Sequence, residues 1–536
     1  MATKPPNIAY GIDDRPDPWI VLVLGLQHLG VVAISFVLPV LIVRETGGTE
    51  QQAEFMVNMT MFACGVGTLL QAIPRGPIGS GYLLPMVAGP SYIAASVLAA
   101  ETGGLALVAG MTGFAGLIVV AASRIMNRLR VLFPTEVVGL VVAMVGLTIL
   151  RLAATNFLGI NDPTETIQSR NVLVAVITLA TICALNIWGR GFAKLACVII
   201  GMAVGYAVSA ALGVLTGEHV RTIAQAPLIS FPFTGHPGLA FDVALIVPFI
   251  VAAICSLLKN VGDLTTCQKM NDADWQRVDM PNVSRGMVAD GIGCVLSGIT
   301  GGHGLSGSSS NVGLSLATGA TSRVIAYATG GLLILFAFCP KLSSVFAIMP
   351  APVIGAVLIF AVSFMVIAGL QILASRMLDG RKTLMVGLAL LGGLSVDMLP
   401  QVVAQAPVWA QPLLHSSLST ATIIVIFLNL LFRIGITRRA TLEVAPGADV
   451  SREVFEFFEQ QGGRWAARKD VIARAESAVA QLAEAVFEHG LTREPLHVTA
   501  TFDELNLAVE VGYVGEPVPL PTTGPHPTEL LERPEA

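Results

Sequence analysis

Gly301-Gly-His-Gly-Leu-Ser-Gly-Ser-Ser-Ser-Asn-Val-Gly313 decides the fold, together with a second stretch, Gly79-Ser-Gly-Tyr-Leu-Leu-Pro-Met-Val-Ala-Gly-Pro-Ser-Tyr92. Glycine, proline and hydroxyl side chains interrupt long apolar sequence at both places. Backbone groups freed by such breaks cannot face hydrocarbon, so both stretches must line protein or water. Transporters built from inverted repeats place their substrate between discontinuous helices of this kind. We therefore expect a binding site between the two stretches, although glycines can also serve only close helix packing.

The composition is that of a chain that lies mostly in lipid. Hydrophobic residues make up 54% of the 536 residues, and the mean hydropathy is +0.74. Charged residues make up 12%, against about 25% in an ordinary soluble domain. The net charge is −5, with basic residues scattered singly, and the seven cysteines form no Cys-x-x-Cys pair. We expect membrane lipid and a small polar solute as partners, and no nucleic acid, metal, cofactor or enzyme activity.

About fourteen segments approach the roughly 20 apolar residues that cross a bilayer. They begin near Trp19, Phe55, Met86, Gly104, Val137, Val172, Ala193, Val243, Gly286, Asn311, Arg323, Pro352, Thr383 and Thr420. The two broken stretches are the third and tenth segments, seven apart. The sequence therefore predicts an all-α integral membrane protein of two inverted seven-helix repeats, with short broken segments in spans 3 and 10.

Basic residues concentrate in the even-numbered connections, as at Arg124, Arg128 and Arg130. The positive-inside rule then places both termini in the cytoplasm and the protein in the cytoplasmic (inner) membrane as a multi-pass protein. The start of the chain lacks the pattern of a signal peptide. Four regions are expected: a cytoplasmic N-terminus (1–18), the transmembrane domain (19–434), a small cytoplasmic α/β domain (435–516) and a proline-rich disordered tail (517–536).

Polar residues in the first and eighth spans extend the candidate site. Gln27 and His28 lie in the first span, and Lys259 and Asp263 in the eighth, again seven spans apart. Ionisable groups at membrane depth are costly and usually face a cavity or a partner. Lys259 and Asp263 stand at i, i+4, so the alternative is a salt bridge that only stabilises the fold.

At these residues the chain resembles the nucleobase-ascorbate transporter family, also called the xanthine/uracil permeases, from about Tyr10 to Arg433. The family signature in the tenth span corresponds to Ser310-Asn311-Val-Gly313-Leu-Ser-Leu-Ala-Thr318-Gly319 followed by Ala-Thr-Ser322-Arg323. This ending is closer to the purine and xanthine carriers of the family than to the ascorbate carriers. Further matches are Gln27-His28, Phe-Pro-Thr-Glu from Phe133 to Glu136, and Gly262-Asp263.

The resemblance implies a secondary carrier that works by alternating access and dimerises. A core of spans 1–4 and 8–11 would move against a gate of the remaining spans, with the solute bound between spans 3 and 10. It also implies that Ser91 and Tyr92 offer the base backbone N–H groups and an aromatic ring. Asn311 would belong to the same site.

Two departures from the family bear on the solute and on coupling. Lys259 stands where the family usually has glutamate, and Ser310 where it has glutamate or glutamine. A lysine ammonium only donates hydrogen bonds, so we predict an oxygen-rich or anionic solute such as xanthine or urate, helped by the hydroxyls of Ser308, Ser309 and Ser310. His28, Lys259 and Asp263 remain as candidates for coupling to H⁺ or Na⁺, with His303 a weaker candidate.

Two alternative functions remain open at this point. An anion transporter of the same seven-plus-seven fold would suit Lys259, but not the purine-like signature. A membrane sensor would bind the solute in the same core and signal through the C-terminal domain. Whether the bound solute crosses the membrane distinguishes a carrier from a sensor.

The C-terminal domain is similar in part to the ATP-binding fold of histidine kinases and anti-sigma-factor kinases. A helix over residues 468–489 and alternating runs at 496–502 and 505–511 carry the likeness. Ala485 stands where that fold needs asparagine, and the later turn at Tyr513-Val-Gly515 lacks its aspartate. We therefore expect nucleotide binding to be lost, and a regulatory or assembly module, or a merely solubilising domain.

Overall fold

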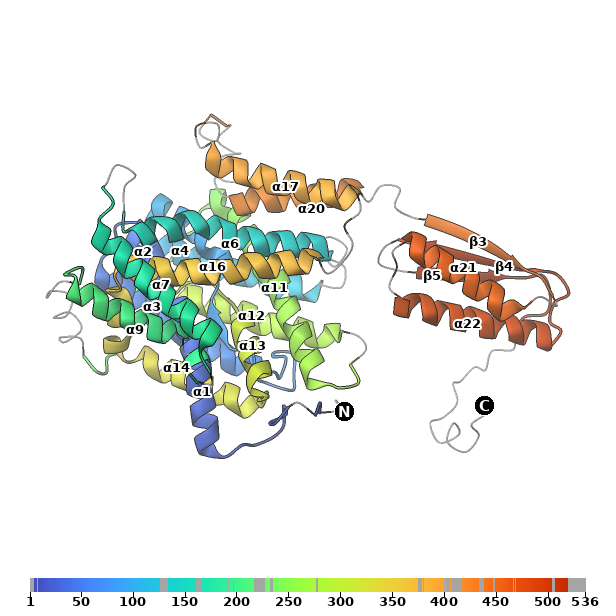
Figure 1. The fold of residues 1–536 in the computed structure, drawn as a ribbon, viewed down its shortest axis with the longest axis horizontal. Coiled ribbons are helices and arrows are strands. Elements are labelled where there is room, and N and C mark those ends of the chain that lie inside the picture. The colour runs from blue at the N-terminus through green and yellow to red at the C-terminus, as the bar shows by residue number, and fades with distance from the viewer. Residues whose placement is uncertain are drawn as a thin grey trace. The chain divides into compact units, whose positions relative to one another are not determined.

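The computed structural model describes residues 4–518, except for residues 7, 126–133, 161–165, 191, 196, 216–226, 232–234, 276–277, 375–377, 379, 400, 402–404, 407–416, 433–437, 447–448, 466, 468 and 504–506. The chain divides into two compact units, Met1–Asn429 and Leu430–Ala536. The first unit is a helical bundle and the second a small sheet with two helices (Figure 1). Most of the predicted proline-rich tail lies outside the described residues.

Up to residue 432 the elements are α1 (Pro18–Ala33), η1 (Ile34–Phe36), α2 (Val37–Glu45), α3 (Glu50–Gln71), β1 (Met86–Ala88), η2 (Pro90–Tyr92), α4 (Ile93–Arg124), α6 (Thr135–Leu158), α7 (Ser169–Trp188), α8 (Phe192–Leu195), α9 (Cys197–Ala211), η4 (Val243–Leu245), α11 (Ile246–Asn271), α12 (Met280–Thr300), β2 (Leu305–Gly307), α13 (Ser309–Thr318), α14 (Arg323–Ala337), α15 (Pro340–Ala347), α16 (Ala351–Ala374), α17 (Gly380–Met398) and α20 (Ser417–Phe432). Each predicted span begins in or beside one of them. The predicted all-α membrane domain is confirmed.

The third and fourth predicted spans are two halves of α4. Helical geometry fails at Gly103 and at Gly104, whose φ of +73° suits glycine. In the described part of the chain, seven helical stretches have the length and hydropathy to cross a membrane, and α14 with α15 forms an eighth that is bent by 82°. The shorter apolar helices α9 and α20 add to these.

The two broken stretches meet inside the first unit. β1 pairs antiparallel with β2, with Met86 opposite Gly307 and Ala88 opposite Leu305. A short helix starts directly after each strand, η2 leading into α4 after β1, and α13 after β2. The expectation that the two stretches lie against each other is therefore confirmed, and two helix N-termini start from one small sheet.

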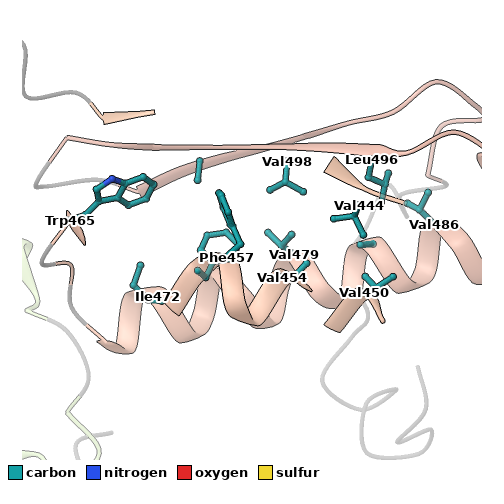
Figure 2. Close-up of a cluster of buried hydrophobic side chains, with 13 residues drawn as sticks. Val444, Val450, Val454, Phe457, Trp465, Ile472, Val479, Val486, Leu496 and Val498 are labelled. Atoms are coloured by element: carbon teal, nitrogen blue, oxygen red, sulfur yellow. The ribbon is translucent and has the colours of Figure 1, made fainter. Parts of the chain in front are cut away.

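The C-terminal unit is an α/β domain with its own core. Its elements are β3 (Arg438–Val444), α21 (Val450–Trp465), α22 (Lys469–Glu488), β4 (Leu496–Phe502) and β5 (Leu507–Gly512), with the sheet in the antiparallel order β3-β4-β5. Alternate residues of β4 are buried, since Leu496 and Val498 face the core and His497 is exposed. Figure 2 shows Leu496 and Val498 with the other apolar core side chains, packed between the strands and the two helices.

The sequence predicts α22, β4 and the greater part of β5 within this domain, and the structure confirms them. It did not anticipate β3 or α21. The helix α21 is amphipathic, and its apolar side Val454, Phe457 and Phe458 is buried in the core. Whether the domain descends from the kinase ATP-binding fold stays a prediction.

Candidate functional site

We call the antiparallel pair of β1 and β2 the crossing. Side chains of neighbouring helices accept hydrogen bonds from its backbone N–H groups. Met86 N donates to Thr68 Oγ1 of α3 at 3.0 Å, and Ala88 N donates to Ser35 Oγ of η1 at 3.1 Å. Backbone polar groups at membrane depth must find partners within the protein. The hydroxyl side chains of the first and second spans therefore make a non-helical crossing stable here.

Two adjacent residues of α11 hold the last residue of β2 from both sides. Asn260 Oδ1 accepts a hydrogen bond of 2.8 Å from Gly307 N, and the Lys259 ammonium donates to the Gly307 carbonyl. The same ammonium lies 3.4 Å from Asp263 Oδ2, one helical turn further on. Lys259 therefore belongs both to the predicted i, i+4 ion pair and to the crossing, which joins the two alternatives that the sequence left open.

A buried aspartate that no spacing pattern in the sequence singles out lies close to Lys259 and Asp263. Asp290 of α12 is 2% exposed and lies near Asn260, Lys259 and Asp263, and neither of its carboxylate oxygens has a hydrogen-bond partner among the described residues. Lys259, Asp263 and Asp290 thus place one cation and two acidic side chains around one stretch of α11. An acidic residue inside the apolar segment that starts near Gly286 was the available signal, because ionisable residues at membrane depth are costly.

His28 is joined to the tenth span. Its Nδ1 lies 2.7 Å from Asn311 Oδ1, and Asn311 Nδ2 donates to Ser308 Oγ at 2.9 Å. Because Asn311 Oδ1 is an acceptor, His28 donates from Nδ1, and the neutral ring then offers Nε2 as an acceptor. The structure thus brings His28 and Asn311 together as the sequence predicts for one site, four residues along the chain from the contact between Lys259 and Gly307.

Several buried polar atoms near the crossing lack a protein partner among the described residues. They include Gln27 Oε1, His28 Nε2, Tyr92 OH, His303 Nδ1 and Ser306 Oγ. Buried polar atoms are nearly always hydrogen-bonded, to protein, water or ligand. The first and tenth spans therefore present acceptors and a hydroxyl that protein groups leave open.

Ser309 and Ser310 are exposed, whereas Ser308 and Asn311 on either side of them are buried. Ser308 caps α13, since its Oγ accepts from Asn311 N at 3.3 Å. The backbone N–H groups of Ser309 and Ser310 precede the hydrogen-bond ladder of the helix and carry its positive partial charge. The start of α13 is thus an accessible set of donors.

Tyr92 and Ser91 lie in η2 and are buried. The Tyr92 ring meets His303 edge-on, with ring centroids 6.4 Å apart, and His303 Nε2 lies 3.0 Å from the Gly89 carbonyl. A Cβ added to Gly304 would lie 2.5 Å from Tyr92 Cγ. In this conformation Tyr92 is a packing residue with His303 as its neighbour, and its stacking on a base stays a prediction.

The end of the family signature binds the start of the chain. Tyr10 forms a parallel bridge to Ala320, with Tyr10 N donating to Gly319 O at 3.0 Å and Thr321 N donating to Tyr10 O at 2.8 Å. Arg323 Nη1 lies 2.6 Å from Asp13 Oδ1. An isolated β-bridge at Tyr10 therefore joins the N-terminal segment 8–14 to the residues that follow α13, a contact that no pattern in the sequence predicts.

The other family match, at residues 133–136, lies apart from this site. Glu136 of α6 is buried and forms an ion pair of 3.1 Å with Lys382 of α17, while Phe133 lies outside the described residues. The ion pair connects two helices of the predicted gate. This match therefore contributes to packing between those helices.

A repeated bundle with two broken helices crossing at its centre defines a membrane carrier of the seven-plus-seven class. The model of the Permease family matches residues 20–402, and the chain belongs to that family. It is similar to a putative purine permease of Clostridium perfringens (28% identity, covering 79% of this chain and 92% of the relative) and to the xanthine permease XanP of Escherichia coli (27%, covering 80% and 96%). It is also similar to the uric acid permease PucJ of Bacillus subtilis (27%, covering 77% and 92%).

Solved structures support the same fold. The chain is similar to murine Slc26a9, an anion transporter in the inward-facing state, with a TM-score of 0.55 and 13% identity over 82% of this chain and 72% of that chain. At this identity the likeness concerns the fold alone. The predicted two inverted seven-helix repeats are thereby confirmed.

Proposed function

We propose that the protein is a secondary active permease for an oxygen-bearing purine such as xanthine or urate. The observation that carries the proposal is the mixture of donors and acceptors around the crossing. Lys259 and the start of α13 supply hydrogen-bond donors, whereas His28 Nε2 and Gln27 Oε1 are acceptors that protein groups leave open. A dioxopurine ring carries carbonyl oxygens and ring N–H groups side by side, so it complements both sets.

The pairing of Lys259 narrows the predicted solute. An ammonium has three hydrogens, and the Gly307 carbonyl and Asp263 engage two of them. One donor is left for a solute oxygen, and the ion pair has no net charge. A neutral carbonyl-bearing base therefore suits the site better than a simple anion, which weighs against the alternative of an inorganic-anion carrier.

Transport would proceed by alternating access, with spans 1–4 and 8–11 moving against the remaining spans. We place both termini in the cytoplasm and the chain in the inner membrane, as the basic residues of the connections indicate. We also propose that the protein forms a homodimer and has no enzyme activity. Ser91 and Tyr92 would contact the solute. His28, Lys259 and Asp263 are the candidates for coupling to H⁺ or Na⁺.

The test is uptake of radiolabelled xanthine, urate, uracil and bicarbonate into proteoliposomes that hold the purified full-length protein. We expect xanthine or urate to accumulate and bicarbonate not to compete. Lys259→Glu should shift the preference towards bases with more ring N–H donors, because a carboxylate only accepts. Bicarbonate uptake without purine uptake would identify an anion carrier, and purine binding without uptake would identify a sensor.

The C-terminal domain has a separate test, deletion of residues 438–536. Its core is closed within the domain, with Phe458 fully buried. We propose a regulatory or assembly role, for which the deletion should change the uptake rate or the oligomeric state. An unchanged rate and size would leave a solubilising role only.

A further inference from the structure

Broken helices in inverted-repeat transporters expose backbone carbonyls, and those carbonyls commonly coordinate the coupling Na⁺. At the end of β2 the corresponding carbonyl is that of Gly307, and its partner is the Lys259 ammonium. Asp263 supplies a carboxylate oxygen 3.4 Å from the same nitrogen. The Lys259 ammonium thus lies where the Gly307 carbonyl and the Asp263 carboxylate converge, at the break in the tenth span.

The ammonium is held in this position. Asn260, next to Lys259 in α11, accepts from Gly307 N at 2.8 Å, so the peptide groups on both sides of Gly307 are bound to one turn of α11. The Lys259 side chain is 19% exposed and that of Asp263 10%. Since the nitrogen is covalently attached, it cannot leave the site during a transport cycle as a bound ion does.

We propose that the Lys259 ammonium permanently occupies a cation position at the crossing, so that solute movement requires no sodium ion. The cation that would otherwise come from solution to balance Asp263 is a side chain of the same helix, α11. This inference rests on the proposed function only for its transport consequence. The occupied cation position can be tested without any solute.

The first measurement is thermal unfolding of the purified, solute-free protein in NaCl and in N-methylglucamine chloride at equal ionic strength. We expect wild type to show no sodium-specific shift of the midpoint. Lys259→Ala and Lys259→Met should show a saturable rise with sodium, because Asp263 and the Gly307 carbonyl then lack their cation. Adding Asp263→Ala should remove that rise.

Lys269→Ala is the matched control, since Lys269 is an exposed lysine of the same helix. It should behave as wild type. A sodium-specific shift in wild type, or its absence in folded Lys259 variants, would overturn the proposal. If neither Lys259 variant folds, equilibrium binding of radioactive sodium to the wild-type protein decides. Saturable sodium binding that is lost in Asp263→Ala would overturn the proposal.

The second measurement is xanthine uptake by wild-type proteoliposomes in sodium and in N-methylglucamine media, with the membrane potential clamped. Equal initial rates are expected, and a rate more than fivefold higher in sodium would contradict the inference. Absence of purine uptake together with the expected unfolding pattern would reject the proposed function but leave Lys259 as the occupant of the cation position.

Discussion

His28 Nδ1 and Asn311 Oδ1 form a hydrogen bond of 2.7 Å, although 283 residues separate them in the chain. The bond connects the first span to the half-helix α13, and both partners are buried. It also determines which ring nitrogen of His28 remains available as an acceptor. Its loss should therefore affect both the placement of α13 and the recognition of a solute.

We predict that His28→Ala lowers the apparent affinity for xanthine about tenfold, since a buried hydrogen bond and its orphaned partner are worth about 1–3 kcal/mol. Concentration-dependent uptake into proteoliposomes measures this affinity. His489→Ala, at an exposed residue beyond α22, should leave it unchanged. An unaltered affinity in His28→Ala would remove His28 from the site.

Gly304→Ala should destabilise the protein, because the added Cβ would lie 2.5 Å from Tyr92 Cγ. Overpacking of this kind typically costs about 1–3 kcal/mol. The measurement is the midpoint of thermal unfolding in detergent. Gly331→Ala is the control, since its Cβ would meet nothing within 4 Å, and its midpoint should stay equal or rise slightly. Equal midpoints for both variants would contradict the tight contact with Tyr92.

Asp290→Asn should change stability and transport in opposite directions. The amide keeps the size of the side chain and removes a buried ionisable group, which is costly at membrane depth, so the unfolding midpoint should stay equal or rise. Uptake should fall by tenfold or more, because such groups are usually retained for function. Wild-type uptake in this variant would show that Asp290 has a packing role only.

The ion pair between Asp13 of the N-terminal segment and Arg323 of α14 can be tested by charge exchange. Asp13→Arg and Arg323→Asp should each lower stability, and the double variant should recover most of the loss. The side chain of Asp13 is 75% exposed, so the ion pair itself is worth about 0.2–1 kcal/mol. Hydrogen exchange of the peptide that spans Tyr10 reports the effect. If the loss of stability in the double variant equals the sum of the two single losses, a direct interaction between Asp13 and Arg323 is ruled out.

The same N-terminal segment should loosen in acid. The side chain of Lys4 and the Gly11 N–H hold the pKa of Asp14 below its ordinary value of 3.8. The folded segment therefore favours the charged form of the Asp14 carboxylate, and this stabilisation is present above about pH 4 and lost as the pH falls below 3.8. Exchange of the Gly11 amide should accelerate in that range after correction for intrinsic rates. Asp14→Asn should already exchange faster at pH 6 and show no further acid step.

The sequence predicts the class of fold because lipid imposes strong rules on composition and length. It also predicts that the broken stretches meet, since Gly301–Gly313 cannot face hydrocarbon. What it could not predict is contact between particular atoms. The i, i+4 spacing indicates the pairing of Lys259 with Asp263, but no local pattern encodes the contact of the same ammonium with the Gly307 carbonyl of β2.

The roles of Asp290 and of the N-terminal bridge at Tyr10 leave little signal in the sequence, for different physical reasons. Asp290 stands alone in an apolar helix, so no spacing rule links it to Asn260. The segment around Tyr10 is joined to the residues after α13 through main-chain groups, and such pairing leaves little trace in side-chain identity. In the C-terminal domain, β3 starts with Arg438 and Arg439, and only its later alternation towards Val444 marks it as a strand.

The pairing of β1 with β2 also has a consequence for biogenesis. Met86 and its partner Gly307 are separated by about 220 residues, and a ribosome adds about 5–20 residues each second. The first broken stretch is therefore made some 10–45 seconds before its partner emerges. During that interval its main chain must stay in water or be held by the insertion machinery, because the crossing cannot form before the segment that carries Gly307 has been made.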